Sequence, residues 1–360
     1  MYKILFPNGI PDGYPTLRGF APKHSMKETD LPRKNRGNIV PLKESLGGDI
    51  LSKSPERFET KSPSTLIVYD KNVGLDAEIL EDKAKGVYCV SSEENIEQNI
   101  CKFLEKGSCK ADWEDIINEI KSPINSVIIS DRYLFNTLHN DNPYKCLEKI
   151  ITTIISKNEK YNIKQKINLL VLYDGYYDSA LVKTKDVENT KEQKDAKEIR
   201  EGIKERITRL VPHKFNTFIN EGKLDLEFLS FCDYTKGEAY LGEYKKLKTY
   251  YRITHDRTIL TNYTIGIATF RISGFNGNGD VVQSQMVEIK SIYNDANSGN
   301  FNDSPREGHE RVLSGIAEIV KFLREYPQYG CYSYNGNPSE PIKEDFNLRN
   351  RMVNIYISKK

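Results

Sequence analysis

A histidine and an arginine, His255 and Arg257, lie two residues apart at the head of an apolar run that starts at Thr258. If this run forms a strand, side chains two residues apart point to the same face. An imidazole beside a guanidinium suits a phosphoryl group, because the imidazole can attack phosphorus or move a proton while the guanidinium holds two phosphate oxygens. The pair therefore predicts a site for a phosphate-bearing ligand.

The spacing around this pair, His255-x-Arg257-x4-Asn262, resembles the His-x-Lys-x4-Asp signature of the phospholipase D superfamily. It is most similar to the degenerate, single-copy phospholipase D-like domain at the C-terminus of MIT-domain proteins, which also carries a His-Asp-Arg sequence. The resemblance covers roughly residues 84–295. It implies a catalytic set in which His255 is the nucleophile or proton shuttle, Arg257 binds phosphate, and Asn262 stands where the family has a supporting carboxylate.

The chain departs from that family in ways that bear on catalysis. Asn262 lacks the negative charge of the family's aspartate, and the family's Gly-Ser element is represented only loosely, by Ser273-Gly274-Phe275-Asn276 at a longer spacing. Active members carry two copies of the motif, whereas the second His-x-Arg here, His309-Glu310-Arg311, has Ile316 in the place of the acid. Catalysis would therefore require a homodimer whose two copies meet at His255.

Three interpretations of the motif stay open. The first is a degenerate phospholipase D-like domain that binds a phosphate-bearing ligand without turnover. The second is an active phosphodiesterase or nuclease, and the third is an assembly protein in which the His-Asp-Arg segment makes only local salt bridges. The resemblance alone also implies a setting, a bacterial nucleic-acid-directed defence assembly.

A cationic strip precedes the motif, and we define it as residues 244–252. It contains four cations and three aromatic rings in nine residues, a composition that can neutralise phosphates and stack on unpaired bases. Nucleic acid is favoured over lipid because no basic amphipathic helix with exposed apolar residues stands out. The alternative is an edge strand in which lysines prevent aggregation. The residues predicted to bind nucleic acid are Lys245, Lys246, Lys248, Tyr250, Tyr251 and Arg252.

Aspartates at the ends of apolar runs support a different mechanism. Asp70, Asp131, Asp174 and Asp233 each follow such a run. Carboxylates at the C-terminal ends of parallel strands converge at one edge of an open sheet, where they could hold Mg²⁺ for phosphate chemistry. The alternative is that each aspartate forms a turn with the backbone that follows. Asp131 and Asp174 are the preferred pair for a metal.

Composition limits the classes of function. The 360 residues include 53 Lys+Arg and 51 Asp+Glu, so the net charge of +2 excludes a generally basic surface but not a local phosphate site. Six scattered cysteines, with no C-x-x-C pair, indicate a reducing compartment and speak against structural zinc. No apolar stretch approaches the ~18 residues of a membrane span, and the N-terminus does not resemble a secretory signal. We therefore expect a cytoplasmic protein without a membrane partner and, since no P-loop is present, without a cofactor.

The chain divides into two parts. Residues 1–62 hold seven of the fifteen prolines and predict an irregular Pro/Gly-rich arm that contacts a partner protein or another subunit. Residues 63–360 alternate strand and helix patterns, which predicts an α/β domain whose mixed sheet is flanked by helices, with antiparallel strands in its later part. A helix is expected after the capping box at residues 91–94, a charged helix within 183–209, a long helix at 305–325, and a closing strand at 353–357.

Overall fold

The computed structural model describes a series of segments of the 360-residue chain. His255, the cationic strip and the charged stretch at 183–209 lie outside the described residues. The described residues are 3–6, 39–41, 65–69, 87–91, 99–107, 113–120, 124–135, 143–160, 166–174, 213–231, 257–262, 264–274, 280–291, 305–327, 330–335, 337–338, 348–350 and 352–353.

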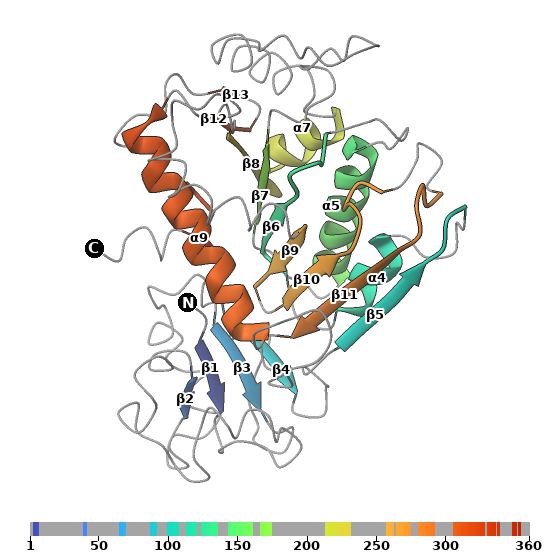
Figure 1. Cartoon of the computed structure of the whole chain (residues 1–360). Coiled ribbons are helices and arrows are strands. Elements are labelled where there is room, and N and C mark those ends of the chain that lie inside the picture. The colour runs from blue at the N-terminus through green and yellow to red at the C-terminus, as the bar shows by residue number, and fades with distance from the viewer. Residues whose placement is uncertain are drawn as a thin grey trace, which may run out of the picture.

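A mixed nine-stranded sheet forms the centre of the described structure, and this confirms the predicted α/β class (Figure 1). The strand order is β13-β12-β8-β7-β6-β9-β10-β11-β5. The middle strands are parallel because helices connect them, whereas the later strands follow one another closely and pair antiparallel. The strands are β5 (Asn99–Leu104), β6 (Ser126–Ser130), β7 (Ile167–Asp174), β8 (Leu224–Phe231), β9 (Thr258–Thr261), β10 (Thr264–Ala268), β11 (Gln285–Ser291), β12 (Gly330–Tyr334) and β13 (Asn337–Pro338).

Helices cover both faces of this sheet (Figure 1). On one face lie α4 (Trp113–Glu119), α5 (Pro143–Lys160) and α7 (His213–Asn220), and on the other lies α9 (Pro305–Glu325), whose bounds match the prediction. Alternate strand residues serve the two faces, so Val127 and Ile129 of β6 join the core under α5, while Ile128 points to the α9 face. None of the described helices has the length and apolar character needed to cross a membrane.

A smaller parallel sheet involves the predicted arm. It has the order β2-β1-β3-β4, made of β1 (Lys3–Phe6), β2 (Ile39–Pro41), β3 (Thr65–Tyr69) and β4 (Val87–Ser91). The rest of residues 1–62 lies outside the described part of the chain. Because β1 pairs with β3, hydrogen bonds join the two sides of the boundary predicted at residue 62. The division into two domains stays a prediction.

Two local expectations are wrong. The predicted helix after residues 91–94 is instead β5, which pairs with β11 over six residue pairs. Its side chains alternate, with Leu104 buried and Phe103 66% exposed, so the strand periodicity outweighs the capping-box signal. At the other end, Met352 and Val353 are helical, so the expected closing strand does not begin there; residues 354–357 lie outside the described chain.

Candidate functional site

Asp131 anchors a polar group of residues at the C-terminal end of β6. Its side chain is fully buried, and its two carboxylate oxygens accept backbone N–H groups of Tyr133 and Ile272, each at 2.9 Å. Its own N–H donates to Leu172 of β7 at 3.1 Å, which fixes the residue at the edge formed by two parallel strands. Burial raises the pKa of the Asp131 carboxyl, while the two N–H donors and the charges of Arg257 and Arg271 act in the opposite direction.

Arg257 reaches the same edge from β9. Because β9 runs antiparallel to β6, with Thr258 opposite Ser130, the residue before β9 lies near the residue after β6. Arg257 has φ +47°, a left-handed conformation that costs roughly 1–2 kcal/mol in a non-glycine residue. Its Nη1 donates to the carbonyl of Thr269 at 3.0 Å, and its Nε is buried without a hydrogen-bond partner among the described residues. Such strain concentrates where a side chain must be aimed for function.

Three arginines lie near Asp131 within the described part of the chain. Arg257 and Arg132 both stack on the ring of Tyr133, with guanidinium carbons 5.5 and 5.7 Å from its centroid. Arg132 and Arg271 are only 3% and 6% exposed, so water screens their charges weakly. Guanidinium groups in such a position can attract an anion.

A turn at residues 271–274 contacts Asp131 and helps to position it, a role that we did not predict from the sequence. Its Ile272 donates to Asp131, and the carbonyl of Ile272 accepts the indole N–H of Trp113 at 2.7 Å and the thiol of Cys146 at 3.0 Å. Ser273, in the segment that stands for the family's Gly-Ser element, donates to the carbonyl of Leu134 at 3.1 Å. The backbone of one residue, Ile272, thus connects Asp131 to α4 and α5. The sequence signals for this arrangement were an aspartate after a buried strand and the Ser273-Gly274 pair.

Asn262 lies at the opposite end of β9 from Arg257. Four strand residues separate them, which corresponds to a distance of roughly 15 Å. Asn262 is fully buried, and its side-chain oxygen accepts the backbone N–H groups of Asn125 (2.9 Å) and Ser126 (3.0 Å), while its amide donates to the Asn125 side chain. The structure therefore brings Arg257, but not Asn262, to the edge with Asp131. The catalytic assignment of Asn262 stays a prediction, and the observed contacts hold the start of β6.

Replacing Asn262 by aspartate distinguishes these two roles. If Asn262 occupies the place of the family's supporting carboxylate, an aspartate there should increase activity. In the observed contacts, the aspartate would instead place a buried negative charge against the side-chain oxygen of Asn125. We expect Asn262→Asp to lower the free energy of unfolding by about 2 kcal/mol in urea titrations and to leave ligand affinity unchanged in the folded protein. Gain of phosphodiester cleavage without loss of stability would contradict the structural role.

The other predicted site residues are described only in part. His255 and the cationic strip (Lys245, Lys246, Lys248, Tyr250, Tyr251 and Arg252) lie outside the described residues, as do Asp70 and Asp233. The backbone of Asp174 ends β7 beside Phe231 of β8, at the same edge as Asp131. No group of three or more potential metal ligands occurs within the described segments. The carboxylate of Asp131 already accepts two N–H groups beside two arginines, which disfavours it as a metal ligand.

Comparisons with known proteins add little to this site. No family model and no curated protein matches the chain. Among solved structures, the chain is similar to phosphatidylserine synthase from Haemophilus influenzae Rd KW20, with 11% sequence identity and a TM-score of 0.32. The match covers 63% of this chain and 39% of the length of the synthase. Membership of the phospholipase D superfamily therefore rests on the His255 motif and stays a prediction.

Proposed function

We propose that this protein binds a phosphate-bearing ligand, foremost nucleic acid, at the edge formed by Asp131, Arg257 and Arg271. The observation that carries the proposal is the position of Arg257, whose charge acts on the fully buried carboxylate of Asp131 and whose guanidinium stacks on Tyr133, in a residue with a strained backbone conformation. Asp131 holds the turn at 271–274 in place through the N–H of Ile272, and Arg257, which is partly exposed, meets the ligand.

Nucleic acid is the favoured ligand because of what precedes Arg257 in the chain. The cationic strip ends at Arg252, only five residues before Arg257, so a polyanion bound at Arg257 lies within reach of the strip. Lysines contribute contacts to further phosphates, and tyrosines offer stacking surfaces for unpaired bases. A mononucleotide or inorganic phosphate would use Arg257 alone.

A second candidate function is phosphodiester cleavage, in which His255 attacks phosphorus within a homodimer. Its support is that the pairing of β9 with β6 brings Arg257, two residues after His255 in the sequence, to the edge where β6 and β7 end at Asp131 and Asp174. Phospholipase D-like chemistry would be metal-free, and chemistry through Asp131 and Asp174 would require Mg²⁺. The bacterial defence setting stays part of this proposal and rests on the resemblance.

The test compares the wild-type protein with a strip variant in which Lys245, Lys246 and Lys248 become glutamine. Labelled single- and double-stranded DNA and RNA are titrated at several salt concentrations, with and without EDTA. We expect the variant to bind at least about tenfold more weakly at low salt, with a log K against log salt slope shallower by about two to three. Product analysis in the same samples detects cleavage and its dependence on metal.

A matched control removes the same charge elsewhere. Lys106, Lys145 and Lys223 are exposed lysines outside the proposed site, and their combined replacement by glutamine should change neither affinity nor slope. Equal losses in both triple variants would mean that only net charge matters and would contradict a defined nucleic-acid site. Absence of binding to every nucleic acid at low salt would overturn the proposed function.

A further inference from the structure

Glu227, on β8, is a fully buried carboxyl group that the proposed phosphate site does not use. Its Oε1 accepts the hydroxyl of Tyr332 at 2.9 Å and the backbone N–H of Arg349 at 2.6 Å. Its Oε2 is buried and has no hydrogen-bond partner among the described residues. Burial raises the pKa of Glu227 to about 7, and the N–H groups of Arg349 and Asn350 and the hydroxyl of Tyr332 offset part of that effect. Ionisation of Glu227 would therefore place an incompletely bonded charge in the interior.

One partner of Glu227 belongs to a short segment near the end of the chain, which we call the C-terminal clasp (Leu348, Arg349, Asn350, Met352 and Val353). Four of these five residues are buried. Asn350 accepts a hydrogen bond from the Ser126 hydroxyl at 3.4 Å and donates to the carbonyls of Val127 (3.4 Å) and Asn168 (3.5 Å). The clasp thus lies across the beginnings of β6 and β7 and reaches β8 through Glu227.

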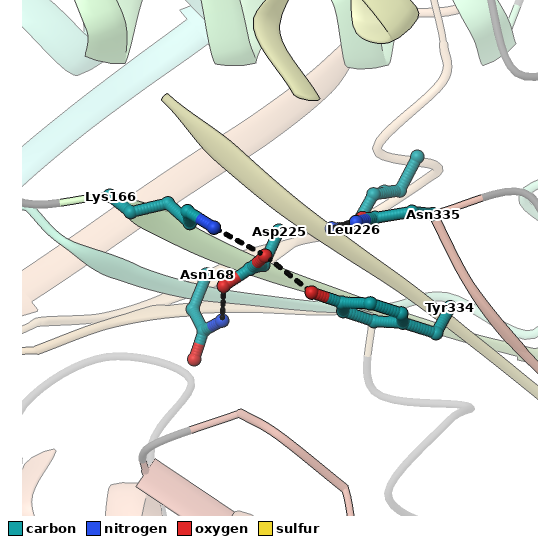
Figure 2. Close-up of polar contacts among 6 residues, drawn as sticks. All are labelled: Lys166, Asn168, Asp225, Leu226, Tyr334 and Asn335. Atoms are coloured by element: carbon teal, nitrogen blue, oxygen red, sulfur yellow. Dashed lines mark hydrogen bonds and ion pairs between the residues drawn. The ribbon is translucent and has the colours of Figure 1, made fainter. Parts of the chain in front are cut away.

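Charged groups surround Glu227 on three elements. Asp225, two residues earlier on β8, accepts hydrogen bonds from Tyr334 (2.7 Å), Lys166 (3.1 Å) and Asn168 (3.4 Å), as Figure 2 shows. The guanidinium of Arg349 in the clasp lies 3.7 Å from the centre of the Tyr334 ring. The charge of Asp225 raises the pKa of Glu227 further, whereas Lys166 is bonded to Asp225 and not to Glu227.

Contacts between β8 and the end of β12 do not involve the clasp. Asn335, in a left-handed conformation (φ +50°), exchanges two hydrogen bonds with the backbone of Leu226, one from its own N–H at 2.7 Å and one to its side-chain oxygen at 2.8 Å (Figure 2). An asparagine with positive φ suits the two-residue turn that joins β12 to β13. β8 and β12 therefore share hydrogen bonds that the clasp does not supply.

We propose that the C-terminal clasp is a proton-controlled latch, which closes on β8 and β12 while Glu227 carries a proton and loosens when Glu227 loses it. When the clasp leaves, Glu227 loses the N–H groups of Arg349 and Asn350 and gains water. In that open state its ionised form is solvated, whereas in the closed state Oε2 has no hydrogen-bond donor among the described residues. The free energy of closing the latch thus depends on the protonation of a single carboxyl group.

The direction of the pH dependence follows from the two states. The open state has the ordinary pKa of 4.5 and the closed state a pKa of about 7, so the closed state binds the extra proton between these values. Closure is therefore most favourable below about pH 4.5 and weakens as the pH rises through 7. Between pH 6 and pH 8, the equilibrium constant for closing should fall about tenfold.

Hydrogen exchange measured by mass spectrometry on the full chain tests the latch. In the wild type, the protection factor of peptides covering residues 348–353, corrected for intrinsic exchange, should fall about tenfold between pH 6 and pH 8. Peptides of β6 should keep their protection. In Glu227→Gln, which cannot ionise, the protection of the clasp should be the same at both pH values. The matched control Glu221→Gln removes an exposed carboxyl and should retain the tenfold fall.

A second variant covers the case in which Glu227→Gln does not fold. Tyr332→Phe removes a donor that lowers the pKa of Glu227, so the loss of clasp protection should move to higher pH while the sheet stays intact. Protection that is equal at pH 6 and pH 8 in the wild type would overturn the proposal. An undiminished pH dependence in Glu227→Gln would also overturn it, because the controlling group would then lie elsewhere.

Discussion

Replacing Asp131 by alanine should lower the free energy of unfolding by about 3 kcal/mol, the largest loss that we expect from a single change at the candidate site. The substitution leaves the N–H groups of Tyr133 and Ile272 buried without their acceptor. It also removes the negative charge that attracts Arg257 and Arg271.

The protein contains its own reporter for this measurement. Trp113 is the single tryptophan of the chain, it is buried, and its indole N–H binds the carbonyl of Ile272, whose N–H binds Asp131. Tryptophan fluorescence during urea unfolding therefore follows the polar group itself. In Asp131→Ala, the transition should move to lower urea, and the emission of the folded protein should shift because the turn at 271–274 is released.

Two further variants show which interaction accounts for the loss of stability in Asp131→Ala. Asp131→Asn keeps one acceptor oxygen but places an NH₂ group against the second N–H, so it should lose part of the stability that alanine loses. Asp115→Asn removes an exposed carboxylate on α4 and should change stability by less than about 0.5 kcal/mol. If Asp131→Ala unfolds at the wild-type urea concentration, Asp131 does not hold the site together.

Replacing Arg257 by glycine should separate ligand binding from stability. Glycine adopts the left-handed conformation of this position without strain, which offsets its greater freedom in the unfolded chain, so stability should change by less than about 1 kcal/mol. The guanidinium is lost, and with it the proposed ligand contact. We expect the affinity for a labelled single-stranded oligonucleotide to fall at least about tenfold at low salt.

Two control variants accompany Arg257→Gly. One keeps a positive charge at residue 257, and the other removes a positive charge elsewhere on the protein. Arg257→Lys retains a cation without the planar fork and should bind with intermediate affinity. Arg311→Gln removes one positive charge from the exposed surface of α9 and should bind like the wild type. Wild-type affinity in Arg257→Gly, together with a loss in the strip variant, would show that the strip binds the ligand without Arg257.

The second His-x-Arg of the sequence shows why spacing alone does not define a site. His309 is buried in α9, where its Nε2 lies 2.9 Å from the carbonyl of Thr261, and burial lowers its pKa to about 4. A neutral imidazole whose Nε2–H donates to a backbone carbonyl supports helix packing. The sequence already spoke against this motif, because it begins a helical pattern and has Ile316 in the place of the acid, and the structure places His309 in α9.

Local patterns were sufficient where local forces decide the structure. The apolar run before Asp131 predicted the strand β6, and the apolar periodicity of residues 305–325 predicted α9, because burial of a whole central strand or of one helix face dominates their free energy. The same reasoning failed at β5, where a capping-box sequence competes with pairing to β11. The backbone pairing of β5 with a strand nearly two hundred residues away cannot be seen in a local pattern, yet it determines that this segment is a strand and not a helix.

For the candidate site, the sequence by itself determined the chemical groups: an arginine next to a histidine, and an aspartate after a buried strand. Only the tertiary structure decided which of them meet. The antiparallel pairing of β9 with β6 brings Arg257 to Asp131 and carries Asn262 to the far end of the strand, although all three came from the same kind of pattern. The physical reason is that strand order and direction follow from burial and hydrogen bonding summed over the whole sheet, whereas a motif fixes only the spacing along one strand.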